Sequence, residues 1–241
     1  MQAFVLAAGL GTRLYPLTAT MPKALVEVQG TPLIKIAIDN LIHQGAKRIV
    51  VNIHHFGDLL RTYLEDHHWD ADILISDERD LLLDTGGGLK KAEPLFLPQE
   101  PILVHNVDIL SHINFSDIIK QHTDSMDLAT LVVSQRNTSR QLLFNSENQL
   151  AGWQNRTTSE TKWVQQPTTN YKQLAFSGIA VIQPELLTLL PPAAQPYSII
   201  PAYLTLAKSH RISYFEHKQS DWLDVGKPET LQRAQKWNFN S

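Results

Sequence analysis

The sequence predicts an α/β fold in which a mainly parallel sheet is covered by helices on both faces. Through the first 125 residues, short apolar runs rich in Val, Ile and Leu alternate with longer segments of helical period. This alternation is typical of strands that feed crossover helices. Each amphipathic helix must bury its apolar stripe on a sheet face, so right-handed crossovers place helices on both sides.

Strands and helices are expected to alternate strictly in the first half of the chain. After a strand at residues 3–8, Thr31-Pro32 offers a capping residue with proline at the first helical turn, and Gly45 ends that helix after Gln44. The further segments are strands at Arg48–Ile53, Ala71–Ile75 and Pro101–His105 and helices at Phe56–Glu65 and Gly86–Pro94.

After residue 125 the apolar runs carry polar interruptions, which favours antiparallel strands added to the same sheet. These runs are Asp127–Ser134, Gln141–Phe144, Gln149–Gln154 and Gln173–Ile182, and helices are expected at Pro184–Leu190, Ser198–Ser209 and Pro228–Trp237. The sequence has no internal repeat and no low-complexity linker, so a single domain over residues 1–241 is predicted.

Composition excludes several classes of function. With 43% hydrophobic and 19% charged residues, the 241-residue chain is typical of a globular protein with a buried core. Its net charge of −3 is too balanced for binding to a nucleic-acid backbone, and the absence of Cys excludes disulfides and thiolate chemistry. The N-terminus lacks the pattern of a signal peptide, and no apolar stretch is long enough to span a membrane, so a cytoplasmic protein is expected.

The strongest motif is the glycine-rich segment LAAGLGTRL at residues 6–14, directly after the first predicted strand. Small residues let backbone N–H groups approach a polyanion closely, although an ordinary tight turn gives the same pattern. Arg13 adds a bidentate cationic donor, and Lys23 adds a point charge at the end of the same loop. The predicted phosphate-binding residues are Leu6, Ala8, Gly9, Gly11, Thr12, Arg13 and Lys23.

The whole segment at residues 6–33, LAAGLGTRLYPLTATMPKALVEVQGTPL, resembles the signature of sugar-1-phosphate nucleotidyltransferases. The resemblance implies a Rossmann-like, three-layer α/β/α fold with a mixed, mainly parallel sheet that binds a nucleoside triphosphate at the glycine loop. It also implies that the phosphate of a sugar 1-phosphate attacks the α-phosphorus in line, so that pyrophosphate leaves and a nucleotide sugar forms. Such a transfer depends on positive charge around the phosphorus more than on an acid or base, and Arg13 and Lys23 are its expected phosphate ligands.

Two aspartates are candidates for holding Mg²⁺, which prefers oxygen ligands and often takes only one or two protein carboxylates. Asp108 follows a predicted strand, at the end where α/β sheets place ligands, and resembles the family's metal-binding aspartate. The family more often has Gly where this chain has Val107. Asp224, within Trp222-Leu223-Asp224-Val225-Gly226, resembles the second metal aspartate, although an aspartate before a helix is also a common cap.

The run Leu83-Asp84-Thr85-Gly86-Gly87-Gly88-Leu89 precedes a predicted helix, where free N–H groups can receive a base or a phosphate oxygen. A plain N-cap by Thr85 is the alternative. By resemblance this run is the family's base-binding loop, and its three-glycine form is most similar to N-acetylmuramate-1-phosphate uridylyltransferases and their relatives. The resemblance assigns the nucleotide to Thr85, Gly86, Gly87 and Asn106.

The sugar side of the site is less well marked. Phe176-Ser177-Gly178-Ile179 resembles the family's sugar-side segment, although a bulge within a strand would also explain the glycine. The family's Glu-Lys element for the acceptor phosphate is not evident, and the segment Arg136–Arg140, Lys162 and Lys172 are the basic candidates. The predicted sugar-binding residues are Asn106, Arg140, Gly152, Ser177 and Gly178.

These features favour a Mg²⁺-dependent enzyme whose substrates are an NTP and a sugar 1-phosphate and which exists as a monomer or weak homo-oligomer. UTP with N-acetylmuramate 1-phosphate is the preferred pair, GTP with mannose or heptose 1-phosphate is second, and phosphocholine cytidylyltransfer is more remote. A nucleotide-sugar sensor without turnover is the non-enzymatic alternative. Val107 slightly favours the sensor, whereas a sensor has no need of the two carboxylates Asp108 and Asp224.

Overall fold

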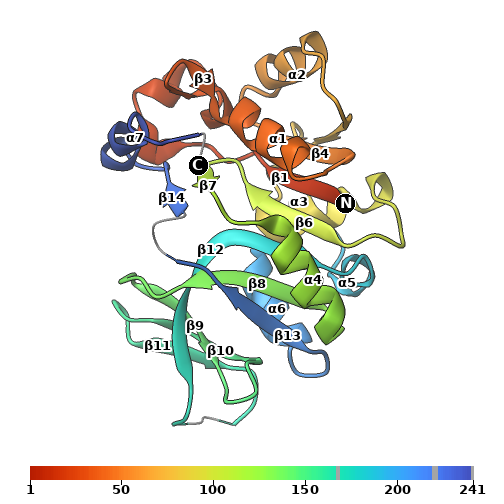
Figure 1. Cartoon of the computed structure of the whole chain (residues 1–241), viewed down its shortest axis with the longest axis vertical. Helices are drawn as coiled ribbons and strands as arrows, with labels where there is room; N and C mark the ends of the chain where they lie inside the picture. The colour runs from red at the N-terminus through yellow and green to blue at the C-terminus, as the bar shows by residue number, and fades with distance from the viewer. Residues whose placement is uncertain (167–168, 219–221, 240–241) are drawn as a thin grey trace.

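The computed structural model describes residues 1–166, 169–218 and 222–239 and has a mixed sheet at its centre (Figure 1). Four parallel strands form one half of this sheet in the order β5-β4-β1-β6. They are β1 (Gln2–Leu6), β4 (Arg48–Ile53), β5 (Asp72–Asp77) and β6 (Ile102–Asn106). The predicted strands are therefore confirmed here, with ends that differ by at most two residues.

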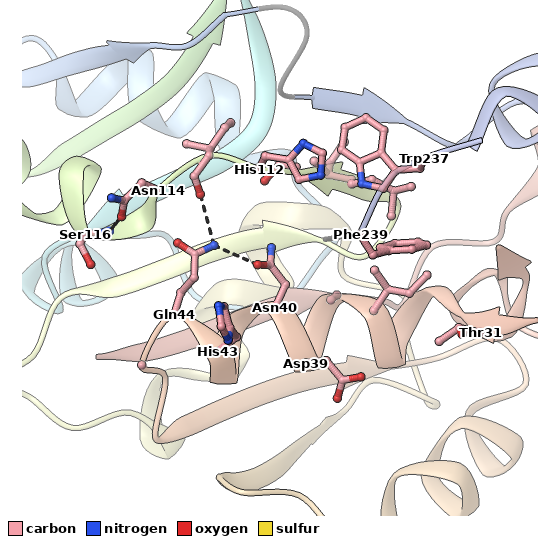
Figure 2. A pocket seen from close by; sticks show the side chains of 17 residues that line it. Thr31, Asp39, Asn40, His43, Gln44, His112, Asn114, Ser116, Trp237 and Phe239 are labelled. Carbon is pink, nitrogen blue, oxygen red and sulfur yellow. Dashed lines mark hydrogen bonds between the residues drawn. The ribbon is translucent and has the colours of Figure 1, made fainter. Parts of the chain in front are cut away.

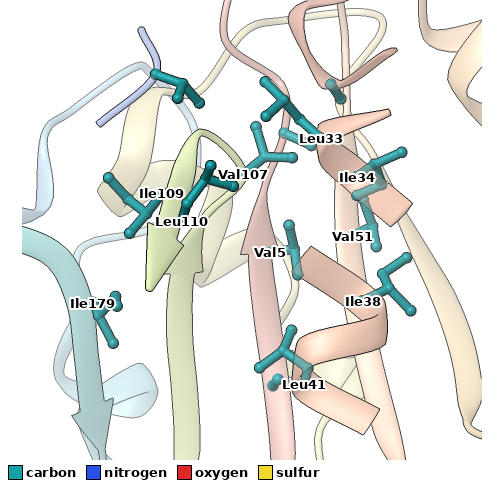
Figure 3. Close-up of a cluster of buried hydrophobic side chains, with 14 of the residues drawn as sticks. Val5, Leu33, Ile34, Ile38, Leu41, Val51, Val107, Ile109, Leu110 and Ile179 are labelled. Carbon is teal, nitrogen blue, oxygen red and sulfur yellow. The ribbon is translucent and has the colours of Figure 1, made fainter. Parts of the chain in front are cut away.

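Helices cover both faces of the sheet because neighbouring residues of a strand point in opposite directions. Ala3 and Val5 of β1 belong to a core with α1, α2, α4 and α7, whereas Phe4 belongs to a second core with α3, α5 and α6. Figure 3 shows the first core between β1 and α1. The helices are α1 (Leu33–His43), α2 (Gly57–Asp66), α3 (Asp84–Lys91), α4 (Phe115–Ser125), α5 (Glu185–Leu189), α6 (Ile199–Leu206) and α7 (Pro228–Ala234). The predicted three-layer, Rossmann-like arrangement is confirmed.

The second half of the chain extends the sheet through one long strand, β12 (Lys172–Ile182). β12 runs antiparallel to β6, β8 and β9, and its register shifts between Phe176 and Ala180, where Gly178 has a φ of 74°. The other strands of this half are β8 (Ala129–Ser134), β9 (Arg140–Phe144), β10 (Leu150–Asn155), β11 (Glu160–Trp163) and β13 (Ile212–Glu216). The expected antiparallel additions are thus present, together with β11 and β13, which the sequence pattern did not reveal.

Two short ladders position residues near the site. β7 (Ile109–Ser111) pairs with β14 (Trp222–Asp224), and β2 (Glu27–Val28) pairs with β3 (Thr31–Pro32). The prediction that Thr31 caps the first helix is wrong, since Gln29 and Gly30 both have positive φ and form a two-residue hairpin turn that draws Thr31 into a strand. Four 3-10 turns complete the described elements: η1 (Thr12–Leu14), η2 (Leu17–Ala19), η3 (Lys23–Leu25) and η4 (Glu93–Leu95).

The longest helices among the described residues, α1 and α4, have 11 residues each. Both fall well short of the roughly 20 apolar residues that a membrane-spanning helix requires. No helix in the described part of the chain could cross a membrane.

Candidate active site

A pocket of about 530 Å³ lies at the carboxyl ends of the parallel strands, where β1 and β6 finish side by side at Leu6 and Asn106. Ligands of open α/β sheets bind at this edge, because the loops that leave neighbouring strands diverge there. The pocket is lined by Leu6, Ala7, Ala8, Gly9, Arg13, Lys23, Asn52, Glu78, Leu82, Asp84, Thr85, Asn106, Val107, Asp108 and Pro196. Most of the predicted nucleotide-binding residues therefore meet at one cavity.

Two buried polar residues that sequence analysis missed hold the glycine loop at its start. The Asn52 side-chain oxygen accepts hydrogen bonds from the N–H groups of Ala7 at 2.7 Å and Ala8 at 3.2 Å, which ends β1 at Leu6. The Asn52 amide donates to Glu78 Oε1 at 2.7 Å, and Glu78 Oε2 accepts from Leu83 N at 3.1 Å. The isolated Asn among the Ile and Val residues of β4 was the available sequence signal.

Burial raises the pKa of the Glu78 carboxyl, against the lowering effect of its hydrogen bonds to Asn52 and Leu83. The side chain is fully buried, so its two oxygens depend on these partners. The Asn52–Glu78 pair thus connects the glycine loop after β1 with the loop before α3, and it fixes the distance between the two walls of the pocket.

Gly11 gives the glycine loop its shape. Its φ is 67°, and a Cβ atom there would lie 2.8 Å from Thr18 Cγ2 and 2.9 Å from Lys23 Cβ, so only glycine fits. The Gly11 carbonyl accepts from Leu14 N at 2.9 Å and from the Thr18 hydroxyl at 3.0 Å, which turns the chain into η1 and η2. Gly9, by contrast, faces open space, and Thr12 is exposed at the start of η1.

The predicted phosphate ligands Arg13 and Lys23 and the predicted Mg²⁺ ligands Asp108 and Asp224, which together are predicted to be catalytic, converge at the mouth of this pocket. Lys23 Nζ forms an ion pair with Asp108 Oδ2, and Arg13 Nη2 lies 4.0 Å from the same oxygen. Asp224 reaches them because β14 pairs with β7, placing Asp224 opposite Ile109, and because Val225 N donates to the Asp108 carbonyl at 2.9 Å. Residues 116 positions apart in the sequence, Asp108 and Asp224, thus face one another.

Gly226 marks the point where these groups meet. A Cβ atom on Gly226 would lie 2.6 Å from Arg13 Nη2, 2.7 Å from Asp224 Oδ1 and 2.9 Å from Asp108 Oδ2. Gly226 N also donates to Asp224 Oδ1 at 2.7 Å, which orients that carboxylate. The absence of a side chain at Gly226 therefore keeps the space between the two carboxylates open.

This donor set fits Mg²⁺. Two carboxylate oxygens face a common space beside the pocket, and Mg²⁺ is commonly bound by one or two carboxylates together with substrate phosphates. Within residues 1–166, 169–218 and 222–239, no cluster of three or more His, Asp or Glu side chains forms a self-sufficient metal site. Asp108 and Asp224 would hold the ion, and the remaining ligands would come from substrate and water.

The prediction that Gly86 and Gly87 offer free N–H groups is wrong. The glycines lie inside α3, which begins at Asp84, and the N–H groups of Gly86 and Gly87 donate to the Tyr197 carbonyl at 2.9 and 3.3 Å. Their Cβ positions are filled by the packed Tyr197 ring and neighbouring backbone, which explains why glycine is needed there. Thr85 does line the pocket, but its hydroxyl accepts from Ile199 N at 3.0 Å and so fixes the start of α6.

On the sugar side, the structure brings Asn106, Ser177 and Gly178 together. A Cβ atom on Gly178 would lie 2.8 Å from Asn106 Nδ2, so the bulge in β12 lets β6 and β12 close against one another. The buried Ser177 hydroxyl bonds to His217 Nε2 at 2.8 Å, and the Ser177 carbonyl accepts from Trp222 Nε1 at 2.7 Å. The bond from Trp222 joins β12 to β14, on which Asp224 lies.

The other two predicted sugar-binding residues lie in the β9–β10–β11 ladder. Gly152 packs under β11, where a Cβ atom would lie 2.7 Å from the Lys162 carbonyl, so strand packing accounts for this glycine. Arg140 is exposed at the start of β9 and pairs through its backbone with Asn155. Among the described residues, no recorded contact links Arg140 or Gly152 to Asp108 or Asp224.

A larger pocket, of about 1180 Å³, shares no lining residue with the candidate site. Figure 2 shows it between α1, the segment after β7 and the C-terminal segment, with His112 stacked on Trp237. Its amides are already paired, since Gln44 donates to Asn40 Oδ1 at 2.9 Å and to the Ile113 carbonyl at 3.2 Å. Pocket size therefore does not identify the site here, whereas the convergence of charged groups does.

Several known proteins resemble this chain in sequence or in fold. The nucleotidyl transferase family model matches residues 2–144. The N-acetylmuramate alpha-1-phosphate uridylyltransferase of Caulobacter vibrioides is 32% identical over 97% of this chain and 95% of its own length. A mannose-1-phosphate guanylyltransferase catalytic subunit beta from Dictyostelium discoideum is 27% identical over 95% of this chain, which spans 62% of that relative. Among solved structures, HddC from Yersinia pseudotuberculosis has a TM-score of 0.76 at 18% identity, with 97% of both chains covered, which is a likeness of fold.

Proposed function

The chain belongs to the nucleotidyl transferase family and is a sugar-1-phosphate nucleotidyltransferase, and from this premise we propose that it transfers a uridylyl group from UTP to N-acetylmuramate 1-phosphate. The products are the UDP-sugar and pyrophosphate. The observation that carries the proposed chemistry is the convergence of Arg13, Lys23, Asp108 and Asp224 around Gly226 at the mouth of the pocket.

The choice of UTP and N-acetylmuramate 1-phosphate is supported by the relative from Caulobacter vibrioides, which matches this chain over nearly the full length of both proteins. GTP with mannose 1-phosphate is the second candidate, supported by the 27% identical guanylyltransferase subunit. Base and sugar selection depend on a few hydrogen bonds, so single residues near the pocket decide between these pairs.

In the proposed reaction, an oxygen of the sugar phosphate attacks the α-phosphorus of the NTP and the bond to the bridging oxygen of pyrophosphate breaks. Arg13 has a side chain that is 55% exposed at the pocket mouth and can offer two parallel N–H groups to the triphosphate. Lys23 has a side chain that is only 12% exposed and contributes a fixed positive charge beside it. Both cations stabilise charge on the phosphates as pyrophosphate leaves.

The residues that would hold Mg²⁺ are Asp108 and Asp224, and the ion would neutralise phosphate charge and orient the two substrates. Asp108 also binds Lys23, so it positions this cation even before substrate arrives. Gly226 N orients the Asp224 carboxylate from the backbone, and the Asn52–Glu78 pair holds the glycine loop in place. In the proposed mechanism the protein therefore acts by positioning the charged groups of the site and by supplying positive charge to the phosphates.

Pyrophosphate release by the purified protein with Mg²⁺ tests this proposal. UTP, GTP, CTP and dTTP are each combined with N-acetylmuramate, N-acetylglucosamine, glucose, mannose and heptose 1-phosphates and with phosphocholine. We expect UTP with N-acetylmuramate 1-phosphate to give the highest kcat/KM, and D108N to give none. Highest activity with GTP and mannose or heptose 1-phosphate would establish the second candidate instead. Nucleotide binding without turnover in the whole grid would favour the nucleotide-sugar sensor.

A further inference from the structure

The two cations that line the pocket both lie against Asp108. Arg13 and Lys23 share the oxygen Asp108 Oδ2, on the side of the site that faces the glycine loop. A sugar 1-phosphate that attacks a triphosphate brings a second polyanion close to the first, so its own phosphate requires a cation as well. In the proposed reaction the nucleotide takes the glycine-loop side, so the cation for the acceptor phosphate is expected near Asp224.

Arg136 is a cation in the required position. It follows the carboxyl end of β8, and its guanidinium stacks on the indole of Trp222 with the central carbon 3.9 Å from the ring centroid. Trp222 lies two residues before Asp224 on β14. The guanidinium of Arg136 therefore lies beside the strand that carries Asp224, and an arginine stays protonated at physiological pH.

The contacts of Arg136 hold its guanidinium in one orientation. Nη2 donates to the Phe176 carbonyl, and Nη1 lies 3.4 Å from the Ser177 hydroxyl, which also bonds to His217. A guanidinium has five N–H groups. Within the described residues, the acceptors of Arg136 are the Phe176 carbonyl and the Ser177 hydroxyl. The remaining N–H groups are therefore available to an oxyanion in a group whose orientation is already fixed, which favours bidentate binding of a phosphate.

The other basic candidates on this side of the chain have partners elsewhere. Lys162 pairs with Glu160 at 3.3 Å and lies over Trp153, in the β10–β11 hairpin. Lys172 forms an ion pair with Glu216 at 2.5 Å, at the first residue of β12, six positions before Gly178. Neither has a recorded contact with Asp108, Asp224 or Trp222 among the described residues, whereas Arg136 contacts Trp222 directly.

We propose that Arg136 binds the phosphate of the sugar 1-phosphate and places it beside Asp224 for attack on the nucleotide. This inference rests on the proposed function and adds the residue that holds the acceptor. Trp222 and Ser177 are positioning residues in this scheme, because they hold the guanidinium plane. Arg136 contacts substrate and is the binding residue.

Steady-state kinetics of R136M, R136K and wild type, with the nucleotide and the acceptor varied separately, test the assignment. Methionine keeps an apolar side chain over Trp222 and removes the charge. Lysine restores the charge but lacks the paired N–H groups of a guanidinium. We expect R136M to raise the KM for the sugar 1-phosphate about 10- to 100-fold, in line with the loss of charge-assisted hydrogen bonds. The KM for the NTP should change less than about twofold, and R136K should recover part of the loss. R156Q is the matched control, because Arg156 is an exposed arginine whose side chain contacts Asn137, the residue after Arg136.

The readouts separate the possible failures. Equal effects of R136M on both KM values, or an effect on melting temperature alone, would assign Arg136 a structural role and overturn the proposal. The same KM effect is expected for N-acetylglucosamine 1-phosphate, used as substrate or competitive inhibitor, because this sugar has the phosphate but no carboxylate. An effect restricted to the carboxylate-bearing sugar would instead assign Arg136 to that carboxylate and overturn the phosphate assignment. A wild-type protein without activity on any substrate pair would refute the proposed function itself.

Discussion

Removal of the Asn52 side chain is expected to damage both stability and nucleotide binding, although Asn52 carries no charge. In N52A, the buried N–H groups of Ala7 and Ala8 lose their acceptor, and Glu78 Oε1 loses its donor. Each buried polar group left without a partner costs about 1–3 kcal/mol. Ala7 and Ala8 adjoin the pocket, where water can partly compensate, so we expect a loss of about 3–5 kcal/mol in the free energy of unfolding.

For a chain of this length, a loss of that size lowers the melting temperature by roughly 10 °C. Urea unfolding followed by circular dichroism measures the free energy, and equilibrium binding of the NTP measures the state of the glycine loop. We expect nucleotide affinity to fall at least about 10-fold, since the loop start is no longer held. An N52A protein within about 1 kcal/mol of wild type, with unchanged nucleotide affinity, would refute this account of the loop.

The N52D variant tests the same network through pH. A carboxylate at this position still accepts from Ala7 and Ala8, but its second oxygen faces Glu78 Oε1 at hydrogen-bond distance. The pKa of Glu78 is already raised above 4.5 by burial, so the folded protein binds this proton more tightly than the unfolded chain does, and the stabilising effect of the proton is lost as pH rises. A second carboxylate raises that pKa further, so the deficit of N52D against wild type should grow from pH 5 to pH 8. A difference in the free energy of unfolding between N52D and wild type that does not vary with pH would contradict this account of the contact between residue 52 and Glu78.

Three further outcomes are expected. D108N should abolish turnover and change the melting temperature by only a few degrees, because the amide oxygen still accepts from Lys23; full kcat would exclude Asp108 from the chemistry. G226A should lower kcat at least about 100-fold, since its methyl group would fall within 3 Å of three charged side-chain atoms. The free energy of unfolding in urea should fall by less than about 1 kcal/mol. Normal turnover of G226A would count against the site geometry. Burial lowers the pKa of His105 to about 4 from 6.5, so the wild type should lose stability as pH falls through this range. H105F should weaken that dependence and gain about 1 kcal/mol at neutral pH, because both ring nitrogens lack partners in the described structure, and an unchanged pH profile would show that His105 is not the group responsible.

The sequence pattern predicted the elements whose structure depends on their own residues. The apolar run Arg48–Ile53 coincides with β4, and the glycine loop lies where its small residues and its position after β1 predicted. The family resemblance likewise led to Arg13, Lys23, Asp108 and Asp224, which the structure brings to one place. The strand predictions are confirmed because hydrophobic period and chain direction are local properties, whereas the functional roles of the four site residues stay predictions.

The failures share a different physical cause. Gly86 and Gly87 looked like part of a loop with free N–H groups, but the carbonyl and ring of Tyr197, more than 100 residues away, bind and cover them. β14 is three residues long and becomes a strand only through its pairing with β7. A short segment with few intrinsic preferences takes the structure that a distant partner imposes on it.

By itself, then, the sequence determined the fold class, the position of the glycine loop at the end of a parallel strand, and the residue types available for phosphate chemistry. Only the tertiary structure decided which groups meet: Asp224 with Asp108 across Gly226, Asn52 with the glycine loop, and Arg136 with Trp222 beside Asp224. The physical reason is that hydrogen bonds and ion pairs act over a few ångströms, and folding alone brings residues far apart in the chain within that range.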